Sequence, residues 1–170
     1  TTVFGGMFTS RLNMNLREDK GYTYGARAYA MRGRGAGWLA LYASVQADKT
    51  GLALKEFFAE MTRLEKEPIT PPEFTLARDG SLRSLSGAFE TVASVGNTMA
   101  SIFTRGLPLD RVQQKVKAFR KARRQEAQAT GVAYYKGGLM QVILVGDPEM
   151  IKKQVTPLKL GPLTELPVER

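Results

Sequence analysis

Glu56 and Glu60 lie four residues apart, a spacing that places two carboxylates on one face of a helix. Such a pair could share a proton or bind a metal ion. Lys55 and Arg63 flank the pair, however, and the 170-residue sequence contains no histidine or cysteine that could complete a transition-metal site. We therefore interpret Glu56 and Glu60 as part of a solvent-exposed helix face.

The absence of histidine and cysteine excludes several classes of chemistry. It removes disulfides, thiolate nucleophiles, imidazole bases and the common zinc sites. Serines are present, but no histidine can activate one, and no Ser-x-x-Lys spacing supplies a lysine base. We expect no catalytic residue and no metal ligand in this chain.

Basic residues outnumber acidic ones by 25 to 16, a net charge of +9 that makes an anionic partner worth considering. Six of the basic residues form a cluster: Lys115, Lys117, Arg120, Lys121, Arg123 and Arg124. The cluster lacks the interleaved aromatic residues that would stack on bases, so we favour a solvated helix face over nucleic-acid binding. The glycine-rich stretch 31–37 resembles a phosphate-binding loop, but it joins two predicted strands, which favours a plain hairpin turn.

Apolar periodicity predicts the elements that must position any site. We expect a helix over residues 1–18 ended by Gly21, then a hairpin with strands at 22–30 and 38–45. A helix capped by Asp48 or Thr50 runs to Glu67, and a capping box formed by Thr70 and Glu73 opens the next helix. Further helices are predicted over 86–103 and over 110–134, the latter with a break near 118–122, followed by a strand at 140–145.

This order predicts an α+β fold with two layers, in which a mostly antiparallel sheet packs against a cluster of helices. No composition shift divides the chain, so we expect a single domain over residues 1–170. The apolar run at 140–145 is far shorter than the roughly 20 residues that a membrane-spanning helix needs. We expect no membrane span.

The most informative stretch is 5–25, which reads GGMFTSRLNMNLREDKGYTYG. It resembles the C-terminal, non-zinc half of the insulinase or pitrilysin-type metallopeptidases, the family that includes mitochondrial processing peptidase. In that family a helix with two glycines shortly before S-R-L runs into L-R-E, a glycine, and a tyrosine at the start of a strand. The matching residues are Gly5, Gly6, Ser10, Arg11, Leu12, Leu16, Arg17, Glu18, Gly21 and Tyr24.

The resemblance implies a bilobed peptidase whose N-terminal half holds zinc on an H-x-x-E-H helix that this chain lacks. The C-terminal half supplies an arginine and a tyrosine seven residues apart, which correspond to Arg17 and Tyr24 as substrate-binding residues. Both side chains donate hydrogen bonds, so they can hold a peptide backbone and stabilise an oxyanion, and losing one such donor costs about 3 kcal/mol of barrier. Tyr22 competes for the role of Tyr24, since alternate strand residues share a face, but the spacing favours Tyr24.

The resemblance also implies a processing-peptidase type of half-domain that begins with strands upstream of Gly5. We therefore expect this chain to be a fragment, the partial C-terminal half of a longer zinc metalloendopeptidase, inactive alone. Zinc would be held by an N-terminal half or by a zinc-bearing partner subunit, and a peptide substrate would pair with the strand at 22–30. The exposed sheet edge predicts self-association of the fragment.

Two alternatives remain open at this point. The chain could be a catalytically silent structural or assembly subunit of the same fold, or, less favoured, a basic nucleic-acid-binding domain. The compartment also stays open between periplasm and cytoplasm, because a targeting segment would lie outside the fragment.

Overall fold

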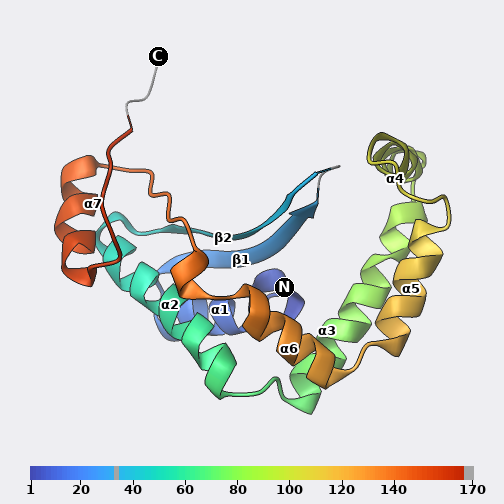
Figure 1. Ribbon diagram of the computed structural model, residues 1–170, viewed down its shortest axis with the longest axis horizontal. Coiled ribbons are helices and arrows are strands. Elements are labelled where there is room, and N and C mark those ends of the chain that lie inside the picture. Colours follow the sequence, from blue (N-terminus) through green and yellow to red (C-terminus); the bar gives the residue numbers. More distant parts are fainter. Residues whose placement is uncertain (33–34, 167–170) are drawn as a thin grey trace.

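An antiparallel hairpin packed on helices forms the centre of the protein. The computed structural model describes residues 1–32 and 35–166. The hairpin consists of β1 (Thr23–Arg32) and β2 (Gly37–Val45). The helices are α1 (Arg11–Asn13), α2 (Thr50–Lys66), α3 (Pro71–Ser84), α4 (Val92–Thr104), α5 (Arg111–Lys121), α6 (Arg124–Tyr134) and α7 (Pro148–Val155). In Figure 1, α1, α2 and α6 lie along one side of the hairpin, while α3, α4 and α5 form an arm that projects from it. The predicted α+β class is confirmed.

The hairpin presents one apolar face to the core. Ala26 lies opposite Ala43 and Ala28 opposite Leu41, and these side chains share the face that packs on the helices. A register shift between Thr23 and Ala26 interrupts the ladder near the start of β1. The stretch 31–37 connects the two strands as predicted, although residues 33 and 34 lie outside the described part of the chain.

The predicted continuous helix over residues 1–18 is wrong. A π-helical segment, Thr2–Gly6, is followed by a turn, and α1 then continues into a second π-helical segment, Met14–Asp19. The helix is interrupted because the backbone of Gly5 is non-helical and that of Met7 is extended. A Cβ built at Gly5 would lie 2.6 Å from the Ala28 backbone nitrogen. The missing side chain lets this segment approach β1 closely. The predicted stop is confirmed, since Gly21 takes φ +64 after the second segment.

Arg11 ties the N-terminal segment to the loop between α2 and α3. Its Nε donates to Glu73 Oε1 at 2.8 Å and its Nη2 to Glu73 Oε2 at 3.0 Å, a bidentate pair. The same guanidinium donates to the carbonyls of Glu67 and Pro68. Glu73 also completes the predicted capping box, which is confirmed: its backbone N–H donates to the Thr70 side chain while its carboxylate accepts from Thr70 N–H. One buried arginine thus joins three elements.

Two further expectations about elements need correction, and a third is confirmed. Helix α2 has Lys49 as its N-cap and no side-chain cap, because the Thr50 hydroxyl donates instead to the Ala47 carbonyl. The predicted helix over 86–103 is split into a 3₁₀ turn, Ser86–Phe89, and α4, whose N-cap is Thr91. The expected break within 110–134 is confirmed and falls between α5 and α6.

The predicted strand at 140–145 is also wrong. The segment carries no strand assignment, and Ile143 and Val145 are mostly exposed. Its apolar composition favours a strand, but the sheet of the described residues consists of β1 and β2 alone, and the segment pairs with neither. The segment therefore stays unpaired. Across the described ranges, the structure contains no helix with the length and hydropathy required to cross a bilayer.

Candidate functional site

Arg17 stands on the π-helical segment that precedes β1, where a neighbouring ring supports its guanidinium. Its Cζ lies 4.2 Å from the centroid of the Phe8 ring, within the range of a cation–π contact. Its Nε lies 3.5 Å from Glu18 Oε1 in a long ion pair. Among the described residues no hydrogen bond engages the terminal nitrogens of Arg17, so these donors remain available to a ligand. The sequence reasoning missed Phe8, whose role depends on the turn between the two π-helical segments.

Tyr24 projects into solvent from the start of β1, with 98% of its surface exposed. Its neighbour Tyr22 packs instead against the hydrophobic core. The expectation that Tyr22 and Tyr24 share a strand face is therefore wrong, and the cause is the register shift between Thr23 and Ala26. The Thr23 side chain stabilises this bulge, since its hydroxyl donates to the Ser44 carbonyl at 2.6 Å and accepts from the Gly25 N–H at 3.0 Å.

The turn at Gly21 joins the elements that carry Arg17 and Tyr24. Gly21 N–H donates to the Arg17 carbonyl at 3.2 Å, and Tyr22 N–H donates to the Leu16 carbonyl at 2.8 Å. No hydrogen bond links the Arg17 and Tyr24 side chains to each other within the described residues. Arg17 presents N–H donors and Tyr24 presents an O–H donor, and the elements that carry them meet at the turn at Gly21. The arrangement suits a ligand that accepts hydrogen bonds.

Glu56 and Glu60 form a partly buried cluster rather than the solvent-exposed face that the sequence predicts. Only 2% of Glu60 is exposed, because the second π-helical segment packs against this side of α2. Asn15 Nδ2 donates to Glu60 Oε1 at 2.8 Å and to Glu56 Oε2 at 3.0 Å, and Arg63 Nη1 donates to Glu60 Oε1 at 3.3 Å. In the described ranges no three acidic, histidine or cysteine side chains cluster in a way that could hold a metal ion.

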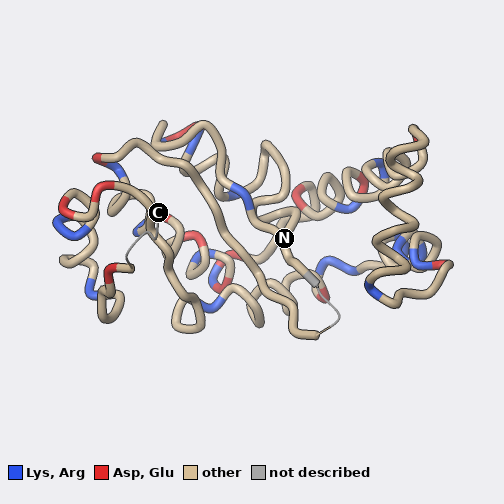
Figure 2. The backbone as a smooth tube through the Cα atoms, turned by 90° about the horizontal axis from the view of Figure 1, so that it is seen from above, with Lys and Arg blue, Asp and Glu red and all other residues tan. Residues whose placement is uncertain are grey.

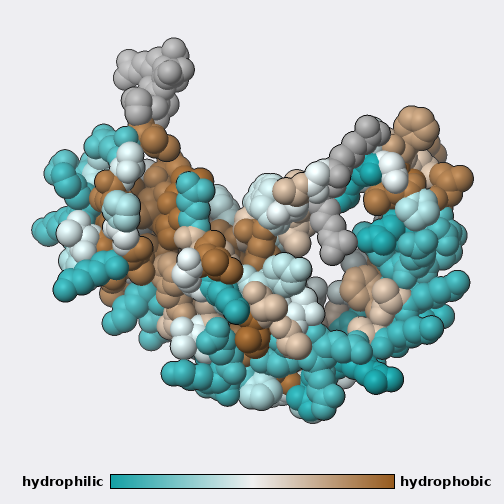
Figure 3. Space-filling view, in the orientation of Figure 1, coloured by the Kyte–Doolittle hydropathy of each residue, from teal (hydrophilic) through white to brown (hydrophobic). Residues whose placement is uncertain are grey.

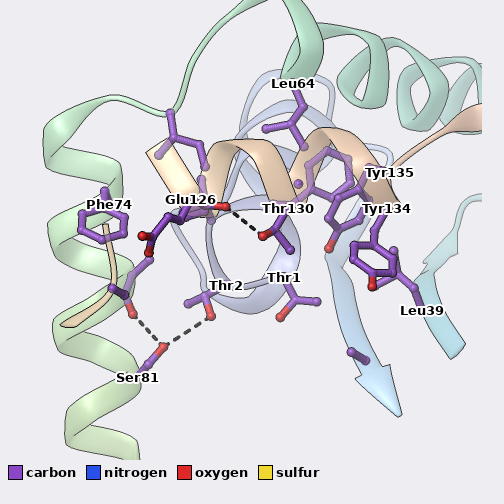
Figure 4. A pocket seen from close by; sticks show the side chains of 18 of the residues that line it. Thr1, Thr2, Leu39, Leu64, Phe74, Ser81, Glu126, Thr130, Tyr134 and Tyr135 are labelled. Carbon is purple, nitrogen blue, oxygen red and sulfur yellow. Dashed lines mark hydrogen bonds between the residues drawn. The ribbon is translucent and has the colours of Figure 1, made fainter. Parts of the chain in front are cut away.

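A cavity of about 1070 Å³ lies where the hairpin, α3 and α6 meet the N-terminus. Figure 4 shows Tyr134 and Tyr135 on one side of it, Phe74 and Ser81 on the other, and Thr1 and Thr2 between them. Neither Arg17 nor Tyr24 lines this cavity. The candidate pair is therefore an exposed site, separate from the cavity.

Tyr135 carries an unsatisfied hydroxyl at this cavity. The residue is buried, its hydroxyl oxygen has no hydrogen-bond partner among the described residues, and burial raises the pKa of its phenol. We expect Tyr135→Phe to increase the free energy of unfolding by about 1 kcal/mol, because it removes an unpaired polar group without removing the ring that packs on Phe4. Denaturant unfolding measures the change. The exposed neighbour provides the control: Tyr134→Phe should leave stability within about 0.5 kcal/mol.

The basic cluster of α5 and α6 is mostly exposed, opposite the more buried Val112, Val116 and Phe119. This burial pattern is the one expected for a solvated helix face. Figure 2 shows that Lys and Arg are distributed along the whole chain and do not gather on these two helices alone. Nucleic-acid binding therefore gains no support from the fold.

Comparisons with known proteins bear on the N-terminal part most directly. Residues 1–81 match a family model described as the peptidase M16 inactive domain. An uncharacterized zinc protease from Rickettsia felis is 29% identical over 116 residues, which cover 66% of this chain and 28% of the Rickettsia protein. This chain thus spans less than a third of the length of that relative.

Two solved structures share the fold. A peptidase M16 inactive domain from Pseudomonas fluorescens aligns with a TM-score of 0.66 and 20% identity, covering 78% of this chain and 32% of that one. A protein from Bordetella pertussis Tohama I, named as a zinc protease, aligns with a TM-score of 0.66 and 21% identity, covering 79% of this chain and 74% of that one. These findings confirm the resemblance to the non-zinc domain that the sequence indicates.

Proposed function

We propose, on the premise that residues 1–81 carry the inactive domain of the peptidase M16 family, that this chain binds the peptide substrate of a zinc peptidase. The observation that carries the proposal is the uncovered position of Tyr24 beside the turn that leads from Arg17. A tyrosine that is 98% exposed contributes almost nothing to the core, so packing does not account for it. Its hydroxyl remains available to a ligand.

The two side chains have complementary roles in this proposal. The guanidinium of Arg17, steadied by the Phe8 ring, donates in a fixed plane to carbonyl oxygens of an extended peptide. The phenol of Tyr24 donates to the oxygen on which negative charge develops during peptide-bond cleavage. Donors that are already positioned stabilise this charge without reorganising during the reaction.

The zinc ion itself belongs elsewhere in the proposed enzyme. The chain contains neither histidine nor cysteine, and its described acidic residues do not form a three-ligand group, so its side chains do not fit a zinc site. We assign the zinc to an N-terminal half of the same protein or to a zinc-bearing partner subunit. The present chain is then inactive alone and contributes donors from the opposite side of the substrate.

The test is peptide hydrolysis by the complete enzyme, with its zinc-bearing half, carrying Arg17→Ala or Tyr24→Phe. We expect each change to lower kcat/KM at least tenfold, because each removes a donor to the substrate or to the developing oxyanion. Arg27→Ala and Tyr29→Phe are matched controls, since they remove the same groups from other exposed positions of β1. Turnover within about twofold of the unmodified enzyme in both Arg17→Ala and Tyr24→Phe would refute the assigned roles.

One observation favours a second candidate, a silent structural or assembly subunit. Figure 3 shows hydrophobic residues at the far end of the arm, over α4, where Val92 and Phe103 are almost fully exposed. Apolar side chains exposed together in this way are typical of surfaces that bind another protein or a second copy of the chain. The sequence of the complete protein and of its partner distinguishes the two candidates. If neither contains an H-x-x-E-H segment, the chain is a silent subunit.

A further inference from the structure

Asn13 makes an unusual contact with the strand that carries Tyr24. Its Oδ1 accepts from the Ala26 N–H at 2.8 Å, and its Nδ2 donates to the Ala26 carbonyl at 2.8 Å. The side-chain amide therefore satisfies both backbone groups of one residue, as the peptide group of a neighbouring strand would. The donor and the acceptor of Ala26 also determine which amide atom of Asn13 is the oxygen.

The contact lies where the register of β1 changes. The shift between Thr23 and Ala26 turns Tyr24 outward, and Ala26 is the residue at which regular pairing with β2 resumes. Successive residues of an antiparallel strand direct their polar groups alternately toward and away from the partner strand. Because Ala26 bonds to Asn13, its polar groups point away from β2. Asn13 therefore closes the outer edge of β1 at this residue, and a peptide cannot pair there.

The same side-chain amide also binds the turn that carries Phe8, the ring in contact with Arg17. Asn13 Nδ2 lies 2.9 Å from the Met7 carbonyl and 3.1 Å from Ser10 Oγ, so it binds both ends of the turn that contains Phe8. Phe8 is the ring beneath the Arg17 guanidinium. Only 7% of Asn13 is exposed, and Ser10 is fully buried, so this network is shielded from water.

We infer that Asn13 is a positioning residue for the Arg17 and Tyr24 pair. It fixes the bulge that presents Tyr24 and the turn that presents Phe8 to Arg17, although it does not touch the substrate itself. The inference rests on the proposed function, because the pair it positions is assigned there. Alanine at residue 13 would remove all four contacts and leave Ala26 with two unpaired backbone groups at the edge of β1.

The experiment compares Asn13→Ala with Asn15→Ala in the complete enzyme. Asn15 is a matched control, since it is the same residue type two positions away and its amide donates to Glu56 and Glu60 instead of to β1. Hydrogen exchange of the peptide that contains Ala26 reports on the strand, and the split between kcat and KM reports on the site. We expect Asn13→Ala to accelerate exchange at Ala26 at least tenfold and to lower kcat at least tenfold with KM changed less than threefold. Asn15→Ala should change both the exchange and kcat less than threefold.

A double variant separates positioning from a general loss of stability. If Asn13 acts through Tyr24, adding Tyr24→Phe to Asn13→Ala should lower kcat less than threefold further, while adding it to Asn15→Ala should produce the full loss seen with Tyr24→Phe alone. Unchanged exchange at Ala26 in Asn13→Ala, or losses that multiply in the double variant, would overturn the inference about Asn13. Full activity of both Arg17→Ala and Tyr24→Phe, together with faster exchange at Ala26 in Asn13→Ala, would refute the proposed function while leaving the contact between Asn13 and Ala26 established.

Discussion

Arg11→Met should lower the free energy of unfolding by about 3 kcal/mol, because it removes one partner of a buried ion pair. The Arg11 side chain is only 6% exposed, and it donates to both carboxylate oxygens of Glu73 as well as to two backbone carbonyls of the loop between α2 and α3. Methionine keeps much of the apolar stem but none of these donors. Glu73 is 29% exposed, which places the effect at the lower end of the range for buried pairs. Denaturant unfolding measures it.

Arg78→Met is the control for this prediction. Arg78 also pairs with a carboxylate at 2.8 Å, that of Asp79, but both side chains are more than a third exposed. A surface pair of this kind contributes about 0–1 kcal/mol. Equal losses in Arg11→Met and Arg78→Met would contradict the role of Arg11 as the buried link between the N-terminal segment and α3.

The same ion pair should give stability a characteristic pH dependence. Burial of Glu73 tends to raise the pKa of its carboxyl, but the hydrogen bonds from Arg11 and Thr70 outweigh it and hold that pKa at about 2, below the ordinary 4.5. The folded state thus binds this proton less readily than the unfolded state does. The contribution is present above pH 4.5 and is lost as the pH falls toward 2. Arg11→Met should flatten this part of the stability curve.

Gly5→Ala should cost about 3 kcal/mol, because the new Cβ would lie 2.6 Å from the Ala28 nitrogen and 2.8 Å from the Ala28 Cβ. Added atoms in a packed region usually cost about 1–3 kcal/mol, and the upper end applies where the obstacle is backbone that cannot rotate away. The segment Thr2–Gly6 would have to move off β1. Thermal or denaturant unfolding of the variant measures the loss.

Gly6→Ala is the matched control from the same motif. A Cβ at Gly6 would find its nearest neighbours at 3.5 Å, an ordinary van der Waals distance. The substitution should therefore change stability by less than about 1 kcal/mol. A loss in Gly6→Ala as large as that in Gly5→Ala would show that the glycine pair is needed for its backbone conformation rather than for the close approach to β1.

Local signals in the sequence predicted the hairpin, the capping box and the stop at Gly21 correctly. Each depends on residues within a few positions of one another, as with Thr70 and Glu73. Both partners of the interaction can therefore be recognised in one short segment of the sequence. The predicted stop at Gly21 also placed Arg17 before a turn and Tyr24 on the strand that follows it. The fold class followed from the order of these elements.

The remaining errors concern contacts between distant parts of the chain. Periodicity placed Glu60 on a polar helix face, but Asn15, 45 residues away, packs over it. The alternation rule placed Tyr22 and Tyr24 together, but a bulge separates them. Asn13 and Phe8 carried no signal, because an asparagine that pairs with strand backbone is indistinguishable in sequence from one on a helix surface. The apolar run at 140–145 lacked the neighbouring strand on which its prediction depended.

The exposure of Tyr24 has a consequence for how such a domain changes over generations. Because the ring contributes almost nothing to the core, its loss would leave expression, solubility and folding intact, and purifying selection on stability would not detect it. Under the proposed function, in which Tyr24 binds the substrate of a zinc peptidase, a lineage could abandon cleavage through a single nucleotide change while keeping the scaffold for assembly. Retention of this aromatic residue across descendants would record continued use of the site, independently of any requirement for folding.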